Sequence, residues 1–580
     1  MTLTDPNQDT AGVPGPAMAG FPNGTRNHSG HSSPKSLALS EKPADDVEID
    51  GDLRLNNSAD RPDMDGDSGG PRVNGDYVQL NGSIFDAHAN HRHPSPEVDR
   101  EIEPYHHPGS DHVIRLSGIE HCMPRSYIRI CLAYRLPRQE MLGDVIARLN
   151  HFVRETVNAK PYLSGYVVAV ENPGNRVGAV EIRFSDTDFL EYPDVGVRYL
   201  TQEEVPYTYD QLCEDRLPPS VIKPEIVSAL GESADEDRAP AFRVQANVVE
   251  GGIIVSVYLH HCISDGNGAG WLMSGNVLND DFAFKRDLDG GNHDIPSLSM
   301  RLDTFAKHKS QVRSELSYSS ANQINDRHLK YKTAQAAETS RHIIKPIGRG
   351  CVFTIPLAKL TDLKGRLMTL ANVERMSRND ILMTLIWHGM TKARIPSLSQ
   401  NPSVTTSKLN IPVNIRKRIK NKLPDSYFGA AVDFASVEMP LCHFADHDDA
   451  SMSETALAIR KAIDQVTEPY IRQSIALAEN PNPKIDVRDL QGSNMDRTDG
   501  ADMYITSWEK LKLYDATFDM DLGRPDWVRK PWSRDPGSCI VLPFDDRKDY
   551  LEVVIQMAEA DMDRLLEDEA FMGYVCRWIE

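Results

Sequence analysis

One stretch of this sequence has residue types and spacing that suit proton transfer, His260-His261-Cys262-Ile263-Ser264-Asp265-Gly266. A neutral imidazole can take a proton from a hydroxyl group near neutral pH, because the ordinary pKa of histidine is about 6.5. A lone histidine is more often a hydrogen-bonded core residue than a catalytic one. His261 is a candidate general base because it stands where a predicted strand runs out into a loop, from where an imidazole could face a cleft.

The residues before this motif alternate as a β-strand requires. One parity is shared by His261 and four apolar residues, Ile253, Val255, Val257 and Leu259. Asp265-Gly266-Asn267-Gly268 has the composition of a turn, so the strand should stop close to His261. The pattern therefore predicts an imidazole at the end of a rigid strand, from where it can face a cleft.

A second constellation is basic. Residues 410–418, Asn-Ile-Pro-Val-Asn-Ile-Arg-Lys-Arg, predict a strand that ends in a positive cluster around Arg416 and Arg418. Such a cluster can bind a phosphate-bearing ligand even in an acidic protein, because charges act locally within a Debye length of roughly 8 to 10 Å. A solvated charged loop and a nuclear import patch are the alternatives, and the cluster alone does not separate them.

Composition and charge restrict the class of protein. The chain has 580 residues, 40% of them hydrophobic, and a formal net charge of -21, which argues against nucleic acid as a partner. No apolar run approaches the roughly 18 residues of a membrane helix, and the first 20 residues lack the basic start and apolar core of a secretory signal. The eight cysteines form no Cys-x-x-Cys pair. We therefore expect a cytoplasmic protein with reduced thiols and no metal site.

The order of the predicted elements divides the chain into four parts. Residues 1–108 are rich in Pro, Gly, Asn, Asp and Ser and predict a disordered acidic extension. Residues 109–285 and 346–580 alternate between helix and strand, which indicates an α/β architecture with two domains. Residues 286–345 are polar and weakly periodic, and we interpret them as a crossover segment between the two domains.

The predicted strands and helices position these motifs. A helix should begin at Ser377-Arg378-Asn379-Asp380, with Ser377 or Asp380 as its cap, and continue to Arg394. The others are strands at 127–136, 166–170, 179–184, 242–249, 252–261, 351–355 and 551–557, and helices from Leu142 to Val153, at 271–278, from Leu357 to Leu370 and from Met562. A tight turn at Glu250-Gly251 should join two of the strands.

The first motif and a late segment together carry a family resemblance. Asp519-Met520-Asp521-Leu522-Gly523-Arg524-Pro525 is similar to Asp-Phe-Gly-Trp-Gly-Lys-Pro, the second signature of the BAHD acyltransferases, whose first is His-x-x-x-Asp-Gly. The likeness covers most of residues 113–580, and its other matching segments are Leu116-Ser117, Ser377 to Arg394, Asn414-x-Arg416, Tyr427-Phe428-Gly429 and Cys539 to Pro543. Within the family, the chain most resembles fungal enzymes related to trichothecene 3-O-acetyltransferase.

The resemblance implies a fold. It predicts two similar chloramphenicol-acetyltransferase-like domains with mixed sheets and flanking helices, joined by a crossover loop. A solvent channel should run between the domains, with CoA entering from one face, the acceptor from the other, and His261 midway.

The resemblance also implies roles for individual residues. Asp265 should point away from the imidazole and pair with Arg416, so that it supports the loop structurally. Thr506 matches a position whose hydroxyl can face the oxyanion. Contacts to CoA are assigned to Ser377, Asn379, Arg416 and Arg418, and structural roles to Gly266, Asp519 and Gly523.

Four positions depart from the family pattern. Met520 and Asp521 stand in place of the Phe and Gly of the second signature, Leu522 in place of its Trp, and Ala430 where Asn is usual. In plant relatives that Trp helps to hold a substrate group, so this contact is not expected here.

The implied activity is O-acyl transfer from an acyl-CoA, with acetyl-CoA as the first donor to consider, to a hydroxyl of a small molecule, in a monomer without a bound cofactor. Direct attack on the thioester suffices, because CoA thiolate is a good leaving group. Three alternatives remain: an N-acyltransferase, a condensation-type domain that takes acyl groups from a carrier protein, and a silent relative that only binds a metabolite or a protein. The sequence lacks the Gly-x-Ser-x-Gly of a serine hydrolase.

Overall fold

The computed structural model describes residues 111–580 except for nine gaps, at 171–176, 229, 231–237, 276–347, 420–422, 424, 426, 479–499 and 532–536. All described residues belong to one compact unit, residues 92–580. The predicted extension 1–108 and the predicted crossover 286–345 lie outside the described residues. The described strands form three sheets.

The sheet that carries the histidine motif has five strands, in the order β13-β2-β8-β7-β5. Its bounds are β2 Tyr127–Arg135, β5 Gly196–Tyr199, β7 Phe242–Val249, β8 Gly252–His260 and β13 Trp527–Arg529. The predicted hairpin of β7 and β8 is confirmed, and Gly251 makes its turn possible with a φ of +83° that disfavours other residues. Every residue of β8 is buried, so this strand is covered on both faces.

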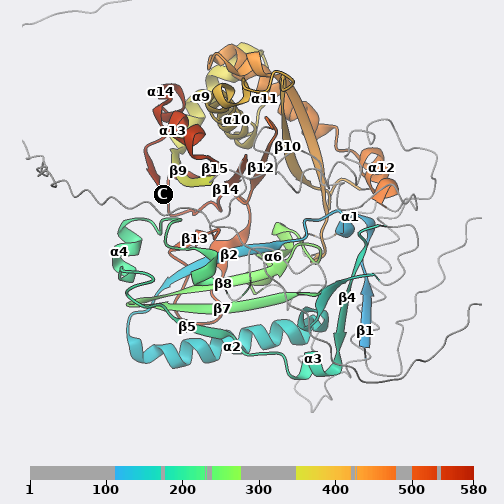
Figure 1. The fold of residues 1–580 in the computed structure, drawn as a ribbon, viewed down its shortest axis with the longest axis vertical. Helices are drawn as coiled ribbons and strands as arrows, with labels where there is room; N and C mark the ends of the chain where they lie inside the picture. The colour runs from blue at the N-terminus through green and yellow to red at the C-terminus, as the bar shows by residue number, and fades with distance from the viewer. Residues whose placement is uncertain are drawn as a thin grey trace, which may run out of the picture. The chain divides into compact units, whose positions relative to one another are not determined.

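Helix α2, Leu142–Ala159, covers one face of this sheet, as Figure 1 shows. The predicted helical spacing is confirmed, because the apolar side chains at Leu142, Val145, Leu149, Phe152 and Val153 are all buried. The helix continues past the last of these apolar residues to Ala159 and ends just before Pro161, the residue expected to break it.

A smaller antiparallel sheet, in the order β1-β4-β3-β6, adjoins the first in sequence. Its strands are β1 Asp111–Arg115, β3 Tyr166–Ala169, β4 Val180–Ser185 and β6 Arg238–Pro240. Short segments connect the strands of this half of the chain, namely α1 Gly118–His121, η1 Gln139–Met141, η2 Pro161–Ser164, α3 Asp186–Leu190, α4 Tyr209–Glu214 and α5 Pro224–Val227. Capping boxes begin α1, α3 and α4, which explains how such short helices form.

The third sheet is mixed and has seven strands, in the order β11-β10-β12-β14-β15-β9-β16. Its bounds are β9 Gly348–Pro356, β10 Thr406–Asn414, β11 Val432–Pro440, β12 Met503–Ser507, β14 Ser538–Val541, β15 Tyr550–Ala558 and β16 Arg577–Ile579. The pairs β10–β12 and β12–β14 are parallel, and the other neighbours are antiparallel.

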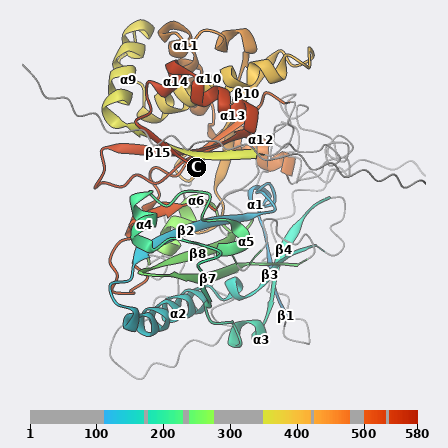
Figure 2. The ribbon, with the colours of Figure 1, turned by 60° about the vertical axis from the view of Figure 1, so that its left-hand side comes forward.

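Helices gather on one side of the seven-stranded sheet, as Figure 2 shows. They are α9 Leu357–Ala371, α10 Arg378–Leu398, η6 Leu441–Phe444, α11 Asp449–Asp464, α13 Glu559–Glu567 and α14 Glu569–Met572. Helix α12, Glu468–Ala478, instead contacts α1, and η8, Lys512–Asp515, contacts the helix that follows the histidine motif. The predicted start of α10 is confirmed, because the Ser377 side chain caps it and Asp380 completes a capping box.

One strand from the C-terminal part of the sequence, β13, joins the five-stranded sheet formed by the N-terminal part. β13 comes from the late segment, yet it pairs antiparallel with β2, so that Arg529 lies opposite Cys131. The Arg529 guanidinium is buried, pairs with Glu552 of β15 at 2.9 Å and donates to the Leu217 carbonyl. Nothing in the sequence pattern indicated this pairing, because it joins residues almost 400 positions apart.

The turn predicted at residues 265–268 is wrong. These residues begin a helix, α6 Gly266–Met273, five residues before the predicted start at Trp271. Gly268 is needed for close packing rather than for a turn, since a Cβ there would lie 2.1 Å from Ser264 Oγ and 2.6 Å from the Phe428 carbonyl oxygen. The predicted end of this helix at Leu278 lies outside the described residues.

A histidine cluster makes the seven-stranded part of the fold sensitive to acid. The ring of buried His388 lies 5.6 Å from the rings of both His443 and His447, measured between centroids. Burial lowers the pKa of His388 to about 3, and burial also lowers the pKa of His447. The unfolded chain therefore binds more protons than the folded one below pH 6.5, and stability is lost as the pH falls through this range.

We expect the free energy of unfolding in urea to drop between pH 6.5 and 5 by up to about 1.4 kcal/mol per pH unit for His388. His388→Gln should show a smaller drop, whereas His151→Gln, at an exposed position of α2, should follow the wild type. Equal slopes in all three proteins would contradict the assignment.

Candidate active site

His261 follows directly after the last residue of β8. Its backbone N–H donates to the Ser126 carbonyl oxygen at 2.9 Å, which extends the β2–β8 pairing by one residue and holds the histidine backbone still. The side chain is partly exposed, but its Nδ1 is buried. Nε2 is therefore the ring nitrogen that can face a substrate.

The surroundings of His261 keep its imidazole neutral. Burial lowers its pKa, and the Asp265 charge and nearby backbone carbonyls raise the pKa only in part. A neutral imidazole at physiological pH can accept a proton, whereas an imidazolium cannot. The arrangement can therefore perform general-base chemistry.

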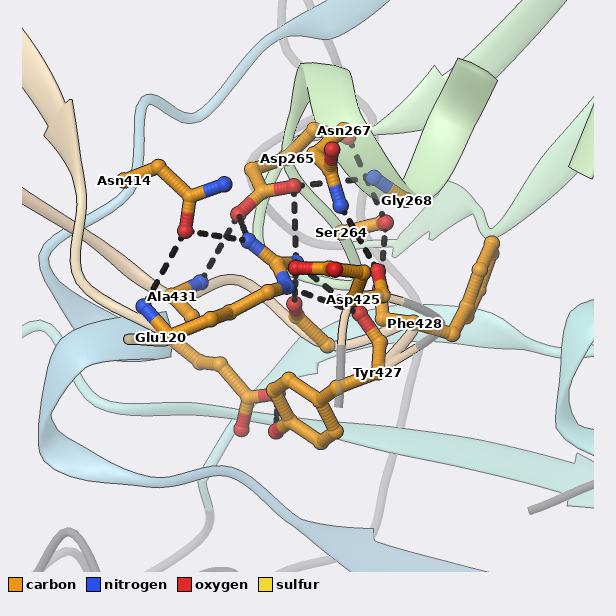
Figure 3. A network of polar contacts seen from close by, with 12 residues as sticks. Glu120, Ser264, Asp265, Asn267, Gly268, Asn414, Asp425, Tyr427, Phe428 and Ala431 are labelled. Atoms are coloured by element: carbon orange, nitrogen blue, oxygen red, sulfur yellow. Dashed lines mark hydrogen bonds and ion pairs between the residues drawn. The ribbon is translucent and has the colours of Figure 1, made fainter. Parts of the chain in front are cut away.

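Asp265 pairs with Arg416, as expected, and Figure 3 shows the network. Arg416 Nη1 lies 2.8 Å from Asp265 Oδ2, and Arg416 Nη2 lies 3.0 Å from Asp265 Oδ1. Backbone N–H groups of Gly268 and Ala431 each donate to the same carboxylate at 2.9 Å. Burial alone would raise the pKa of Asp265, but Arg416 and these donors outweigh it and hold the pKa below its ordinary value. Asp265 is therefore a buried anion with both oxygens occupied.

Arg416 also binds the chain that turns after β10. It donates to the carbonyl oxygens of Tyr427 and Gly429, both at 2.9 Å, and its side chain is completely buried. Ser264 Oγ donates to the Phe428 carbonyl, and Asn267 donates to the Asp425 carbonyl at 2.9 Å. The histidine loop is thus joined to Asp425, Tyr427, Phe428, Gly429 and Ala431, and the structure shows no hydrogen bond from Asp265 to the His261 ring.

The four predicted CoA contacts have different surroundings. The Arg416 side chain is completely buried, and its N–H groups donate to Asp265, Tyr427 and Gly429. The predicted contact between Arg416 and a CoA phosphate is therefore wrong. Arg418 donates from Nη1 to the carbonyls of Ile463 and Val466, at 2.7 and 3.0 Å. Ser377 caps α10, and the buried Oδ1 of Asn379 has no hydrogen-bond partner. No contact joins the latter two to His261 within the described residues.

The remaining predicted residues lie on separate segments. Thr506 is on β12, where its hydroxyl lies beside the Tyr504 phenol. The Asp519 carbonyl accepts a hydrogen bond from Arg148 of α2 at 3.2 Å, and Arg148 also pairs with Asp521 at 2.8 Å. Gly523 has a φ of +76°, which favours glycine there. The second signature therefore contacts α2 through Arg148, which is the kind of contact that a structural element makes.

One residue at the site escaped the sequence analysis. Arg125 donates to the Cys262 sulfur, to the His121 carbonyl at 3.1 Å and to the Gly178 carbonyl at 2.7 Å. It therefore fixes the residue that follows His261. No sequence signal indicates this contact, because Arg125 and Cys262 are 137 positions apart.

The described part of the chain shows no group of three or more His, Cys, Asp or Glu side chains arranged to hold a metal ion. It also contains no helix that is both long and apolar enough to cross a membrane.

The mixed α/β fold and the histidine loop held by Asp265 and Arg416 can be compared with known protein families. The model of the Transferase family matches residues 211–572, and that of the trichothecene 3-O-acetyltransferase-like N-terminal domain matches residues 126–276. This chain belongs to the Transferase family. The predicted resemblance to BAHD acyltransferases is confirmed with it, and the protein is an acyltransferase.

Individual relatives agree with this family. O-acetyltransferase ptmV of Penicillium ochrochloron is 25% identical over 522 residues, which cover 80% of this chain and 96% of the relative. Acyltransferase easC of Emericella nidulans is 23% identical over 483 residues, with the same coverage of both chains. The structure of F. sporotrichioides TRI101 complexed with coenzyme A and T-2 superimposes with a TM-score of 0.64 at 18% identity, and covers 81% of this chain and all of that one. This likeness confirms the predicted fold.

Asp265→Asn should destabilise the protein strongly, because it leaves the Arg416 guanidinium buried without a counter-ion. We expect a loss of about 3 to 5 kcal/mol in the free energy of unfolding, measured by urea denaturation. Asp425→Asn is the matched control in the same network, since its pair with Lys417 is exposed and should contribute less than about 1 kcal/mol. Equal effects of the two substitutions would show that the buried pair is not the element that ties the loops.

Proposed function

We propose that this protein transfers an acyl group from an acyl-CoA to a hydroxyl group of a small secondary metabolite. The observation that carries the proposal is His261, a neutral and partly exposed imidazole at the end of a buried strand. The relatives named O-acetyltransferase support oxygen rather than nitrogen as the acceptor atom. The solved relatives in complex with coenzyme A, T-2 or deoxynivalenol support CoA as the co-substrate and a small molecule as the acceptor.

In the proposed mechanism, Nε2 of His261 takes the proton of the acceptor hydroxyl while the oxygen attacks the thioester carbonyl carbon. The new C–O bond forms, and a tetrahedral oxyanion results. Collapse of this intermediate breaks the C–S bond, and the imidazolium returns the proton to the CoA thiolate. No covalent acyl-enzyme is formed. The proton taken in the first step is the proton given back in the second.

The other site residues support this step in our proposal. Asp265 is a positioning residue, and it holds the loop of His261 through Arg416, with Gly266 at the start of α6. The Thr506 hydroxyl stabilises the oxyanion. Ser377, Asn379 and Arg418 contact CoA, and Asp519 and Gly523 shape the loop that is fastened to α2. Acetyl-CoA is the proposed donor, because several relatives are named acetyltransferases.

We also propose a domain organisation, a location and an oligomeric state for this protein. Residues 109–285 and 346–580 are the two acyltransferase domains, joined by the crossover 286–345 and preceded by the extension 1–108. The separate sheets in the two parts support this division, although β13 belongs to the sheet of the first domain. All eight cysteines are free thiols, which supports a cytoplasmic location, and we propose that the protein is a monomer there.

His261→Ala should lower kcat by about 10²- to 10⁴-fold, the span expected when a general base is removed. The measurement is acetyl transfer from acetyl-CoA to a panel of alcohols, followed by mass spectrometry. His151→Ala, a histidine exposed on α2, should keep the wild-type rate. Transfer at an undiminished rate by His261→Ala would rule out the proposed mechanism.

The pH profile of kcat/KM should report the same base. Burial places the pKa of His261 below its ordinary value of about 6.5. In the free enzyme the imidazole of His261 should therefore be neutral, and the enzyme fully active, at pH 7 to 8. Activity should decline only on the acid side, with an inflection below pH 6.5. An inflection above pH 7 would contradict the direction of the shift.

A further inference from the structure

One side-chain amide of the seven-stranded sheet has an unused hydrogen-bond donor. Asn410 of β10 is only 4% exposed, and its Nδ2 is buried without a hydrogen-bond partner among the described residues. Its Oδ1 accepts from the Ser436 hydroxyl of β11 at 2.6 Å, so one end of the amide is held in place. A buried N–H group without an acceptor costs free energy on folding. Asn410 therefore carries an N–H group that a ligand oxygen can satisfy.

Asn410 lies on the face of its sheet that meets the five-stranded sheet. Residues that pair directly across neighbouring strands share a face, and so do residues two apart on one strand. Following the pairs across β10, β12, β14 and β15 places Asn410, Thr506 and Glu552 on one face. Glu552 pairs with Arg529 of the five-stranded sheet at 2.9 Å. Asn410 and the proposed oxyanion residue Thr506 therefore face the same way, toward that sheet.

The strand β12 leads from Asn410 to the histidine loop. Asn410 pairs with the residue two positions before Thr506. Trp508 lies two positions further on, so the way from the Asn410 pair to Trp508 is roughly 13 Å along the strand. The Trp508 Nε1 is 3.9 Å from the place that a Cβ on Gly266 would take, and Gly266 begins the helix that follows the histidine motif. A molecule of a few rings with its reacting hydroxyl at His261 can therefore reach Asn410 with an oxygen at its other end.

A cavity of about 320 Å³ adjoins Asn410 on the side away from Trp508. It is lined by Lys408, the preceding residue on this face of β10, together with Glu438 of β11 and Asp502. Hydroxyl and amide groups of Asn401, Ser403 and Thr406 also line it. Two carboxylates against one ammonium disfavour the phosphates of CoA, whereas a neutral molecule rich in oxygen can form hydrogen bonds with these walls. This end of the sheet face therefore suits the acceptor rather than the donor.

We propose that Asn410 binds an oxygen atom of the acceptor and so selects a neutral, oxygen-bearing alcohol, an inference that rests on the proposed acyl transfer. Nδ2 of Asn410 donates to a carbonyl oxygen of the acceptor, while the reacting hydroxyl of the same molecule lies at His261. The cavity beside Lys408 takes the part of the molecule that extends beyond Asn410. Asn410 thus determines specificity and does not touch the reacting atoms.

Paired acceptors test this assignment. Each pair is a hydroxy ketone that the wild type acetylates from acetyl-CoA and its counterpart without the ketone oxygen, and the pair with the largest difference in KM is used. Asn410→Leu should raise KM for the hydroxy ketone by about 5- to 100-fold with little change in kcat, because the donor to the ketone oxygen is lost. KM for the counterpart and KM for acetyl-CoA should not change.

Two further variants sharpen the comparison. Asn410→Asp keeps an oxygen for the Ser436 hydroxyl but has no N–H group, so it should act in the same direction as Asn410→Leu. Asn158→Leu is the matched control, since Asn158 is a partly exposed residue of α2, and it should leave every KM at the wild-type value.

Melting temperatures test the site without catalysis. Ligand-free Asn410→Leu should melt at or above the wild-type temperature, because a buried N–H group without an acceptor has been removed. The hydroxy ketone should stabilise the wild type and His261→Ala, and Asn410→Leu much less, whereas CoA should stabilise all three proteins equally.

An unchanged KM for the hydroxy ketone in Asn410→Leu would overturn the proposal. A rise confined to KM for acetyl-CoA would overturn it too, because the pantetheine arm rather than the acceptor would then lie at Asn410. A lower melting temperature with an unchanged substrate preference would show that the amide is purely structural. If His261→Ala retains transfer while the preference for the hydroxy ketone still depends on Asn410, the proposed mechanism fails and the subsite stands.

Discussion

The buried pair of Asp265 and Arg416 is the interaction on which the site depends. It joins the start of α6 to the chain that follows β10, and it is enclosed so completely that Arg416 has no exposed side-chain surface. Removing both charges from water is costly, so such a pair contributes definite geometry more than net stability. The cost is offset here because every donor and acceptor around it is satisfied, including the N–H groups of Gly268 and Ala431.

His261 gains its properties from this constraint. The imidazole needs a fixed direction, a low pKa and an open side, and three different elements provide them. β8 fixes the backbone, burial of the ring lowers the pKa, and the side chain stays partly exposed while Nδ1 is buried. Asp265 does not contact the ring, so the histidine acts without the orienting carboxylate of a hydrolase triad. This suits a reaction in which the nucleophile is the substrate's own hydroxyl group.

Local features of this fold could be predicted from the sequence, and contacts between distant segments could not. Three local features were confirmed, the β7–β8 hairpin, the helix α2 and the cap of α10. Each of them depends on residues that are close together in the sequence. The turn expected at Asp265 failed because glycines also mark places of close packing, as at Gly268. Arg416 was assigned to a phosphate because its positive charge is visible in the sequence, whereas its partner Asp265, 151 positions away, follows only from the family or the fold.

Arg416 and Arg529 show how a buried charge serves the architecture of a fold. Both guanidinium groups lie where water is excluded, and each meets a carboxylate of the chain, Asp265 for Arg416 and Glu552 for Arg529. Backbone carbonyl oxygens accept further hydrogen bonds from them, those of Tyr427 and Gly429 from Arg416 and that of Leu217 from Arg529. Since a buried cation without such partners would be costly, each pair fixes the two segments that it joins. In the mechanism that we propose, these charged residues therefore fix the geometry of the fold, and proton transfer is left to the neutral imidazole of His261.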